Sequence, residues 1–291
     1  MVNITKAILD RRSVRVFRSF SLSYEEIREL IKAACYAPAG GNDPTWEVIV
    51  VQDDVIKDEI TKVSLNQEFI RYSSVVFVFL GGRTVNVAAA IQNLLLAAHH
   101  MGLEGCWIGA FDKREVAKIL KVPPEVPIHA IVAVGKPEEI PTNPGKRFPE
   151  EVMHFERYGN RKIDLSLLKK IVKQADDKLE EFKTLRENVK SNYGEESYYM
   201  YRLEEKYAAF VFRPLLKRVI RILEELGVYR KLCERLKEAV KEYERGRGEL
   251  LRKTLNINSR EVVLWERQYS NDAFPELIRE VVKAVLKCDT S

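Results

Sequence analysis

The sequence predicts a chain in two parts: strands and helices alternate in residues 1–160, and helices alone fill residues 161–291. After Asp164, apolar residues recur at alternating spacings of three and four, the pattern of a long amphipathic helix. In the first part, three apolar runs have the length and composition of buried strands: 46–51, 75–80 and 129–135. Because the two patterns do not mix, we expect two domains, 1–160 and 161–291.

The first segment changes from helix to extended chain. Apolar residues from Ile4 to Ile8 recur on one helical face. From residue 13 onward polar and apolar side chains alternate, so Ser13 and Arg15 lie on the same side of the segment. We therefore expect both side chains to reach one ligand.

The other elements of the first part follow in order. Ser23 and Glu26 have the spacing of a capping box, which predicts the start of a helix that ends before Pro38. Residues 86–102 are apolar nearly all round but too few to span a bilayer, which indicates a helix buried in the domain. Further helical segments are expected near 53–66 and 112–120.

The second part begins after an arm. Residues 135–159 are rich in proline, glycine and charge, which predicts extended chain. Apolar seams at helical spacing then predict helices over 165–189, 197–212, 214–226, 229–244 and 274–287. We expect this part to be an all-α helical module.

Charge, hydropathy and cysteines narrow the class of protein. Lys and Arg number 19 against 20 Asp and Glu in residues 1–160, and 29 against 23 in residues 161–291, so the net charge of +5 comes from the helical part. The N-terminus carries charges where a signal peptide needs an apolar run, and we expect a cytoplasmic protein without membrane contact. The four cysteines have no Cys-x-x-Cys or Cys/His spacing, so neither a disulfide framework nor a metal site is predicted.

Three short motifs suit a ligand. RRSVRVF (11–17) puts three arginines, which bind phosphate in bidentate fashion, beside a serine hydroxyl. In APAGGNDPTW (37–46), two glycines let the backbone approach a flat ligand, and Asn42 offers a donor and an acceptor. GLEGCWIG (102–109) can lay backbone N–H groups against a ring edge. Taken singly, each has an ordinary alternative: a solvated helix end, a turn, and a turn whose Trp107 packs in the core.

Taken together and in this order, these stretches make residues 1 to about 160 resemble the nitroreductase family of FMN-dependent oxidoreductases. The family pattern R-R-S-x-R-x-F matches Arg11, Arg12, Ser13, Arg15 and Phe17. Its A-P-S-G-G-N-x-Q-P-W loop matches Ala37, Pro38, Gly40, Gly41, Asn42 and Trp46. Its helix and loop, A-x-Q-N-x-x-L-A-A and G-L-G-x-x-W-I-G, match AAIQNLLLAAHHMGLEGCWIG, and its closing pattern matches Gly135, Pro137, Lys146, Arg147 and EEVMHFERYG.

The resemblance implies an α+β fold, with a three-layer α/β/α sheet domain that forms a homodimer and binds FMN in clefts built by both subunits. It implies that the phosphate, the ribityl chain and the polar ring edge are held by Arg11, Arg12, Ser13 and Arg15. The flavin would be lined by Pro38, Ala39, Gly40, Gly41 and Asn42 and covered by Cys106, Trp107, Ile108 and Gly109. Lys146 and Arg147 would also contact the FMN phosphate.

Three departures from the family pattern affect substrate preference more than flavin binding. The usual loop serine is Ala39, and the usual Gln-Pro before tryptophan is Pro44-Thr45. An aspartate often found at the start of the buried helix is replaced by Asn86.

The implied reaction is hydride transfer from NADH or NADPH to the flavin, followed by ping-pong reduction of a nitroaromatic, a quinone or another small acceptor. The cofactor carries this chemistry, so no side-chain general acid is named. Arg15 is our candidate for the positive charge that stabilises the reduced ring. No Gly-x-Gly-x-x-Gly follows a strand, so a separate nicotinamide domain is not predicted.

The helical module lies outside the resemblance. Its tyrosine-rich stretch 192–202 and its basic excess could bind an acidic partner or nucleic acid. Because the charge excess is only six, a solvated helical surface is favoured. Alternatively, its helices cap the flavin pocket or enlarge the dimer interface, with Tyr198, Tyr199 and Tyr201 as pocket walls. The rival hypothesis for the whole chain is a non-redox flavin-binding sensor or scaffold whose helices bind a macromolecule.

Overall fold

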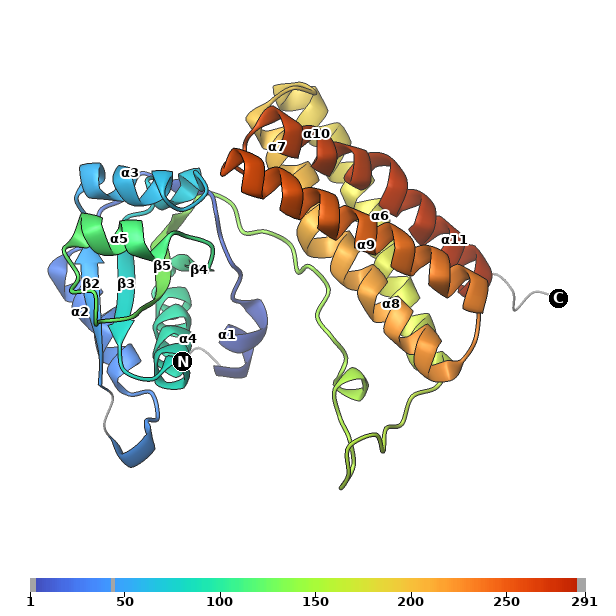
Figure 1. Ribbon diagram of the computed structural model, residues 1–291, viewed down its shortest axis with the longest axis horizontal. Coiled ribbons are helices and arrows are strands. Elements are labelled where there is room, and N and C mark those ends of the chain that lie inside the picture. The colour runs from blue at the N-terminus through green and yellow to red at the C-terminus, as the bar shows by residue number, and fades with distance from the viewer. Residues whose placement is uncertain (1–3, 43–44, 287–291) are drawn as a thin grey trace. The chain divides into compact units, whose positions relative to one another are not determined.

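The computed structural model describes residues 4–42 and 45–286 (Figure 1). The chain divides into two compact units, Met1–Thr142 and Asn143–Ser291. Each unit has its own hydrophobic core.

The N-terminal unit is built on an antiparallel sheet. β5 pairs with β1, β3 and β4, and β3 also pairs with β2. The three predicted strands are confirmed as β2, β3 and β5. The strands span Phe17–Arg18 (β1), Trp46–Val51 (β2), Val75–Gly81 (β3), Glu104–Ile108 (β4) and Ile128–Pro137 (β5).

Helices cover both faces of the sheet, which confirms the predicted three layers (Figure 1). Along β3, Phe77 and Phe79 face one core and Val76 and Val78 face the other, because side chains alternate along a strand. The first core also contains α2 and α4, and the second contains α3 and α5. The helices span Ile4–Asp10 (α1), Tyr24–Cys35 (α2), Asp54–Lys62 (α3), Thr84–His100 (α4) and Lys113–Leu120 (α5).

The predicted capping box starts α2. The Ser23 hydroxyl accepts a hydrogen bond from the Glu26 backbone N–H at 3.3 Å, and the Glu26 carboxylate accepts one from the Ser23 N–H at 2.8 Å. The Ser23 backbone N–H, and then the Ser23 hydroxyl, which also donates to the Glu26 carboxylate at 2.9 Å, lower the pKa of Glu26.

The second unit is helical, and no strand occurs in its described residues. Its α-helices span Leu165–Tyr193 (α6), Tyr198–Glu205 (α7), Arg213–Leu226 (α8), Arg230–Thr254 (α9), Arg260–Gln268 (α10) and Phe274–Leu286 (α11). The predicted seam of α6 is buried from Leu168 to Phe182, whereas Leu165 is exposed. The expected single helix over 197–212 is instead α7 continued by a π-helical segment, Lys206–Phe212.

The packing boundary between the units lies earlier than the 160/161 boundary expected from the sequence. Glu151 is buried, and its carboxylate lies 2.6 Å from the Arg218 guanidinium of α8. Phe148 packs against the helical core, with Arg218 5.5 Å above its ring. These contacts join the arm to the helices, although most of it has the extended conformation that its composition predicts.

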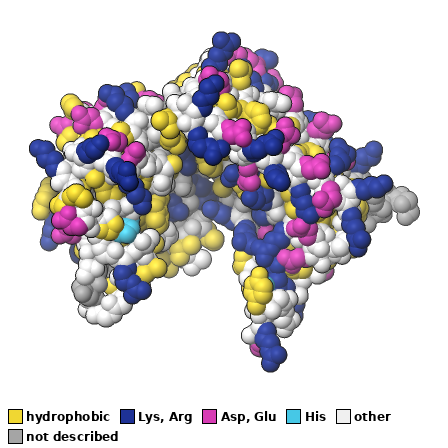
Figure 2. Space-filling model, in the orientation of Figure 1, with side chains coloured by type: hydrophobic (Ala, Val, Ile, Leu, Met, Phe, Trp, Pro, Cys, Tyr) yellow, Lys and Arg dark blue, Asp and Glu magenta, His cyan; other side chains and the backbone are white. Residues whose placement is uncertain are grey.

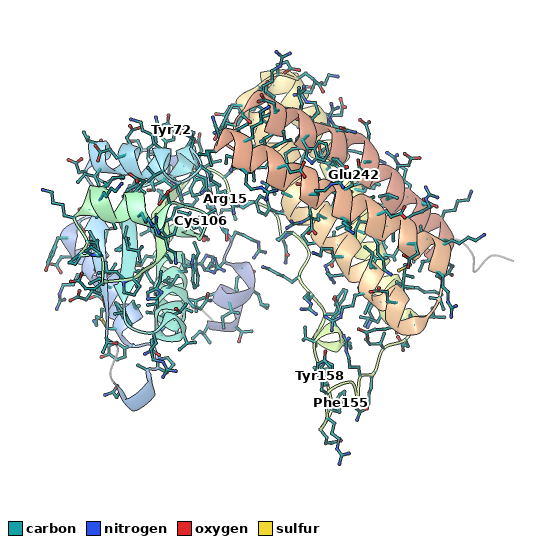
Figure 3. The ribbon with its side chains drawn as sticks, in the orientation of Figure 1. Arg15, Tyr72, Cys106, Phe155, Tyr158 and Glu242 are labelled. Atoms are coloured by element: carbon teal, nitrogen blue, oxygen red, sulfur yellow. The ribbon has the colours of Figure 1, made fainter. Side chains whose placement is uncertain are left out.

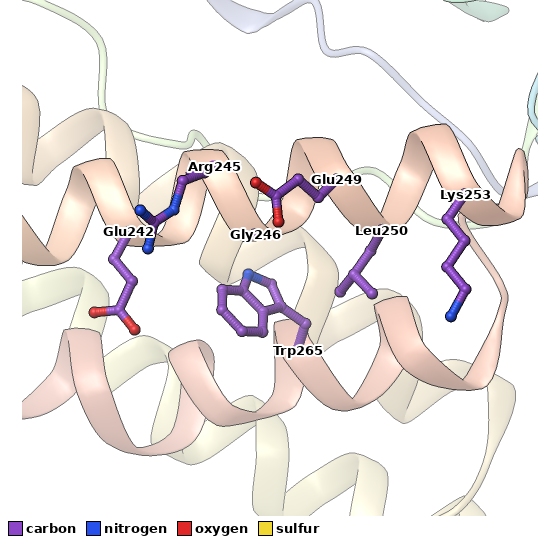
Figure 4. A pocket seen from close by; sticks show the side chains of 7 residues that line it. All are labelled: Glu242, Arg245, Gly246, Glu249, Leu250, Lys253 and Trp265. Atoms are coloured by element: carbon purple, nitrogen blue, oxygen red, sulfur yellow. The ribbon is translucent and has the colours of Figure 1, made fainter.

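A groove of about 380 Å³ runs along α9 beside Trp265 of α10 (Figure 4). The indole crosses α9 at Gly246, where a Cβ atom would overlap its ring. The indole N–H donates to the Tyr243 carbonyl at 3.3 Å. The groove is lined by Glu242, Arg245, Gly246, Glu249, Leu250, Lys253 and Trp265.

Candidate functional site

The arginine motif runs along the outer edge of β4. Ser13 and Gly105 form a parallel bridge, and the Val14 N–H donates to the Gly105 carbonyl at 3.3 Å. Val14 and Phe17 are buried, which anchors this segment on the domain. The fold therefore brings together two motifs that lie about 90 residues apart, and Figure 3 shows Arg15 close to Cys106 of β4.

The three arginines of this motif have three different surroundings. Arg12 donates to the carbonyls of Leu9 at 2.6 Å and of Arg11 at 3.0 Å, which caps the end of α1. Arg15 lies 5.8 Å from the centre of the Phe69 ring, within cation–π range. The Arg11 guanidinium makes no hydrogen bond or ion pair within the described chain. Arg11 is therefore the arginine best placed to receive an anion.

On β4, the groups available to a ligand are the backbone and the ring of Trp107. Cys106 and Ile108 turn their side chains into the core, so they can contact a ligand only through the backbone. Trp107 is 42% exposed, which excludes the alternative of a core tryptophan. A Cβ atom on Gly109 would meet no atom within 4 Å, so open space adjoins this backbone.

The glycine loop has the left-handed backbone that its sequence favours. Gly40–Asn42 forms one 3₁₀ turn, with φ of 68° at Gly41 and 54° at Asn42. The Asn42 N–H donates to the Ala39 carbonyl at 3.0 Å. Pro38, Gly40, Gly41 and Asn42 are exposed, and a Cβ atom on Gly41 would meet nothing within 4 Å.

The predicted site residues are divided between the two units. The arginine motif, the glycine loop and β4 belong to the first unit. Lys146 and Arg147 belong to the second unit, where Arg147 donates to the Glu151 carbonyl at 2.9 Å. The part of this pair in a flavin site stays a prediction.

The acidic groups near the arginine motif are paired. Lys6 hydrogen-bonds Asp10 and lowers the pKa of that carboxyl. Glu104, at the start of β4, is buried and bonded to the His99 ring. The sequence analysis missed this buried pair, for which its spacing of five across a helix end gives no periodic signal.

Sequence reasoning also missed Arg83. It follows β3 directly, and its guanidinium Nη1 lies 3.7 Å from the position that a Cβ atom on Gly40 would take. The signal that could have found it is a basic residue at the Gly81-Gly82 turn into the buried helix.

Comparison with known proteins agrees with this geometry. The profile of the nitroreductase family matches residues 8–72 and 82–136. The N-terminal unit is a nitroreductase-family domain. The match includes both the arginine motif and β4, and the helical unit lies beyond it.

Relatives and solved structures place the nitroreductase-family domain among oxidoreductases. A protein of Archaeoglobus fulgidus whose name pairs NADH dehydrogenase with NAD(P)H nitroreductase is 29% identical over 153 residues, which cover 48% of this chain and 88% of the relative. A Bacillus subtilis protein named FMN reductase (NADPH) is 27% identical over 194 residues, covering 56% of this chain and 77% of the relative. The structure of NfrA1 from B. megaterium superposes with a TM-score of 0.55 at 25% identity, covering 64% of this chain and 85% of that one.

The surface of the helical unit mixes both charge signs. On the face shown in Figure 2, acidic side chains are interspersed with basic ones over these helices. Tyr198 and Tyr199 are half exposed, and Tyr199 stacks on Tyr193 with ring centres 4.3 Å apart. Tyr201 donates to Glu196 at 2.9 Å. None of the described helices combines the length and apolar character needed to cross a membrane.

Proposed function

We propose that the nitroreductase-family domain binds FMN, takes a hydride from NADH or NADPH, and reduces a nitroaromatic, a quinone or another small acceptor. The observation that carries this proposal is the pairing of the arginine motif with β4 at Ser13 and Gly105. It puts the unpaired Arg11 guanidinium and the open backbone of Gly109 on neighbouring segments.

The residues present suit FMN. Arg11 offers an unpaired guanidinium for the phosphate, and Ser13 is exposed for the ribityl hydroxyls. Open space at Gly41 and Gly109 leaves room for a flat ring beside two stretches of backbone. When bound, FMN supplies hydride transfer to and from its ring.

The chain itself supplies binding, orientation and charge. Arg11 would hold the phosphate, with Arg12 beside it at the end of α1, and Arg15 would stabilise negative charge at the polar ring edge. Trp107 covers the site and excludes water from it. Because donor and acceptor use the same pocket, the oxidised nicotinamide leaves before the acceptor binds.

We further propose that the protein is a cytoplasmic homodimer in which both subunits build each site. This proposal rests on the family resemblance, which implies flavin clefts built by two subunits. The arm also carries exposed apolar side chains suited to a partner: Val152, Met153, Phe155 and Tyr158, of which Figure 3 labels the last two.

Titration with FMN followed by an acceptor assay tests this function. We expect one FMN per chain and FMN-dependent oxidation of NADH or NADPH with a quinone or a nitroaromatic. Colourless protein that cannot be reconstituted with FMN would refute the proposal.

A further inference from the structure

A small polar site lies between the glycine loop and the start of α4. Arg83 is exposed, and its guanidinium is next to Gly40. It has no ion pair or side-chain hydrogen bond within residues 4–42 and 45–286. Its charge is therefore available to a ligand at the loop.

Asn86 is a buried residue in the first turn of α4, three residues after Arg83. Two contacts fix the register: the Asn93 amide donates to the Ala33 carbonyl at 3.2 Å, and Arg83 lies beside Gly40. The chain from 33 to 40 thus runs antiparallel to α4 from 93 to 83. Asn86 is seven residues from Asn93, two turns along the same helical face, which turns it toward the loop.

The Asn86 side chain is 7% exposed, yet its amide has no hydrogen bond among the described residues. The amide is therefore available to a ligand. His129 adds a second such group, because Thr84 holds its Nδ1 at 3.2 Å while its buried Nε2 lacks a partner in the described part of the chain.

The charge of this site favours an anion. The first turn of α4 contains no acidic residue, and its N-terminal N–H groups have no side-chain cap. The helix dipole therefore adds to the charge of Arg83. Asn86 itself brings no charge and can donate through its amide.

We propose that Arg83, with the Asn86 amide behind it, binds an oxyanion carried by a substrate, a carboxylate or a phosphate, beside the glycine loop. The site rests on geometry alone. Its assignment to the reacting substrate rests on the proposed function, in which the same loop lines the flavin. The enzyme then selects anionic substrates over neutral ones of equal shape.

Two probe pairs test this site on the full chain as purified. para-Nitrobenzoate and para-nitrobenzamide share ring and nitro group and differ in charge, and NADPH differs from NADH by one phosphate. Dissociation constants are measured by ligand-observed NMR titration. The variants are Arg83→Gln, Arg83→Lys and, as matched control, Arg28→Gln. Arg28 is an exposed arginine of α2 without an ion pair or side-chain hydrogen bond to another described residue.

We expect the wild type to prefer the anionic member of at least one pair, and Arg83→Gln to reduce that preference about two- to fivefold, the scale of an exposed charge contact. Arg83→Lys should keep most of the preference and Arg28→Gln all of it. If the preference that depends on Arg83 is seen with the nitrobenzoate pair, the anion is on the acceptor. If it is seen with the NADPH pair, the anion is on the nicotinamide. An unchanged preference in Arg83→Gln, or no preference in the wild type, overturns the proposal.

FMN binding, measured on the same preparations, keeps the two proposals apart. An Arg83-dependent preference in protein that cannot bind FMN leaves the anion site standing and refutes the proposed function. Flavin-loaded protein that shows no such preference refutes the anion site and leaves the proposed function standing.

Discussion

The three arginines of the motif have different contacts because the backbone turns each side chain toward a different neighbour. Arg12 is held by α1 and Arg15 lies over Phe69, whereas Arg11 has no partner among the described residues. We predict that Arg11→Ala weakens FMN binding about 10- to 100-fold, the range of a lost charge-assisted hydrogen bond.

Arg15→Ala should shift the flavin reduction potential more than it weakens FMN binding. FMN titration and spectroelectrochemistry measure both, and Arg28→Ala is the control. Equal loss of FMN in the Arg11 and Arg28 variants would contradict this assignment.

Two glycines of α9 offer a matched test of packing. At Gly246 a Cβ atom would overlap the Trp265 ring, whereas at Gly248 it would meet nothing within 4 Å. We predict that Gly246→Ala lowers the free energy of unfolding of the helical unit by about 1–3 kcal/mol through overpacking. Gly248→Ala should raise it by up to about 1 kcal/mol through helix propensity. Urea unfolding followed by Trp265 fluorescence measures both, and a shift of the same sign in the two variants would contradict the packing.

At the scale of elements, the capping box of α2 gives a pH-dependent prediction. Ser23→Ala should cost about 1 kcal/mol of unfolding free energy. The folded-state pKa of Glu26 is lowered below its ordinary value of 4.5, so the box stabilises the domain above that pH and is lost as the pH falls through the folded pKa. The stability difference between wild type and Glu26→Gln should therefore shrink on acidification. Urea unfolding followed by Trp46 and Trp107 fluorescence checks this, and a difference that grows in acid would argue against the box.

The arm is fixed to the helices by one buried ion pair. Glu151 accepts two hydrogen bonds from the Arg218 Nε and Nη2 atoms at 2.9 and 2.6 Å. Removing the carboxylate leaves a buried guanidinium uncompensated, so Glu151→Gln should cost the helical unit about 3 kcal/mol. Urea unfolding followed by Trp265 fluorescence tests this, with Glu150→Gln as the neighbouring control. If the two variants unfold alike, residues 143–164 are not part of the helical unit.

Periodicity predicted the elements whose apolar residues repeat. The runs at 46–51, 75–80 and 129–135 became strands, and the seam of α6 is buried from Leu168 to Phe182. Residues 104–108 were expected only as part of a loop, because Gly105 and the flanking Gly102 and Gly109 hide the alternation of buried Cys106 and Ile108 with exposed Trp107. The π-helical segment at 206–212 was missed because its apolar residues also fit an α-helix.

The candidate site was predicted by motif, and its contacts come from the fold. The arginine motif and β4 were both named from sequence, but their pairing at Ser13 and Gly105 is a long-range contact that local patterns do not contain. Arg83 carries no motif, and only the approach of Gly40 distinguishes it from other exposed arginines.

At the scale of the whole molecule, the chain joins a nitroreductase-family domain to a helical unit beyond the family match. The helical unit has a core of its own and mixed surface charge on the face in Figure 2. We therefore expect flavin chemistry to depend on the N-terminal unit. The tyrosines at 198, 199 and 201 stay candidates for a contact that restricts the acceptor.

Anaerobic reduction of the FMN-loaded protein tests the central claim most directly. Stopped-flow mixing with NADH and with NADPH should bleach the visible absorbance of the flavin. Later addition of a quinone or a nitroaromatic should restore it without a further nicotinamide. Flavin that is bound but stays oxidised with both nicotinamides would contradict the proposed oxidoreductase and favour a non-redox flavin-binding protein.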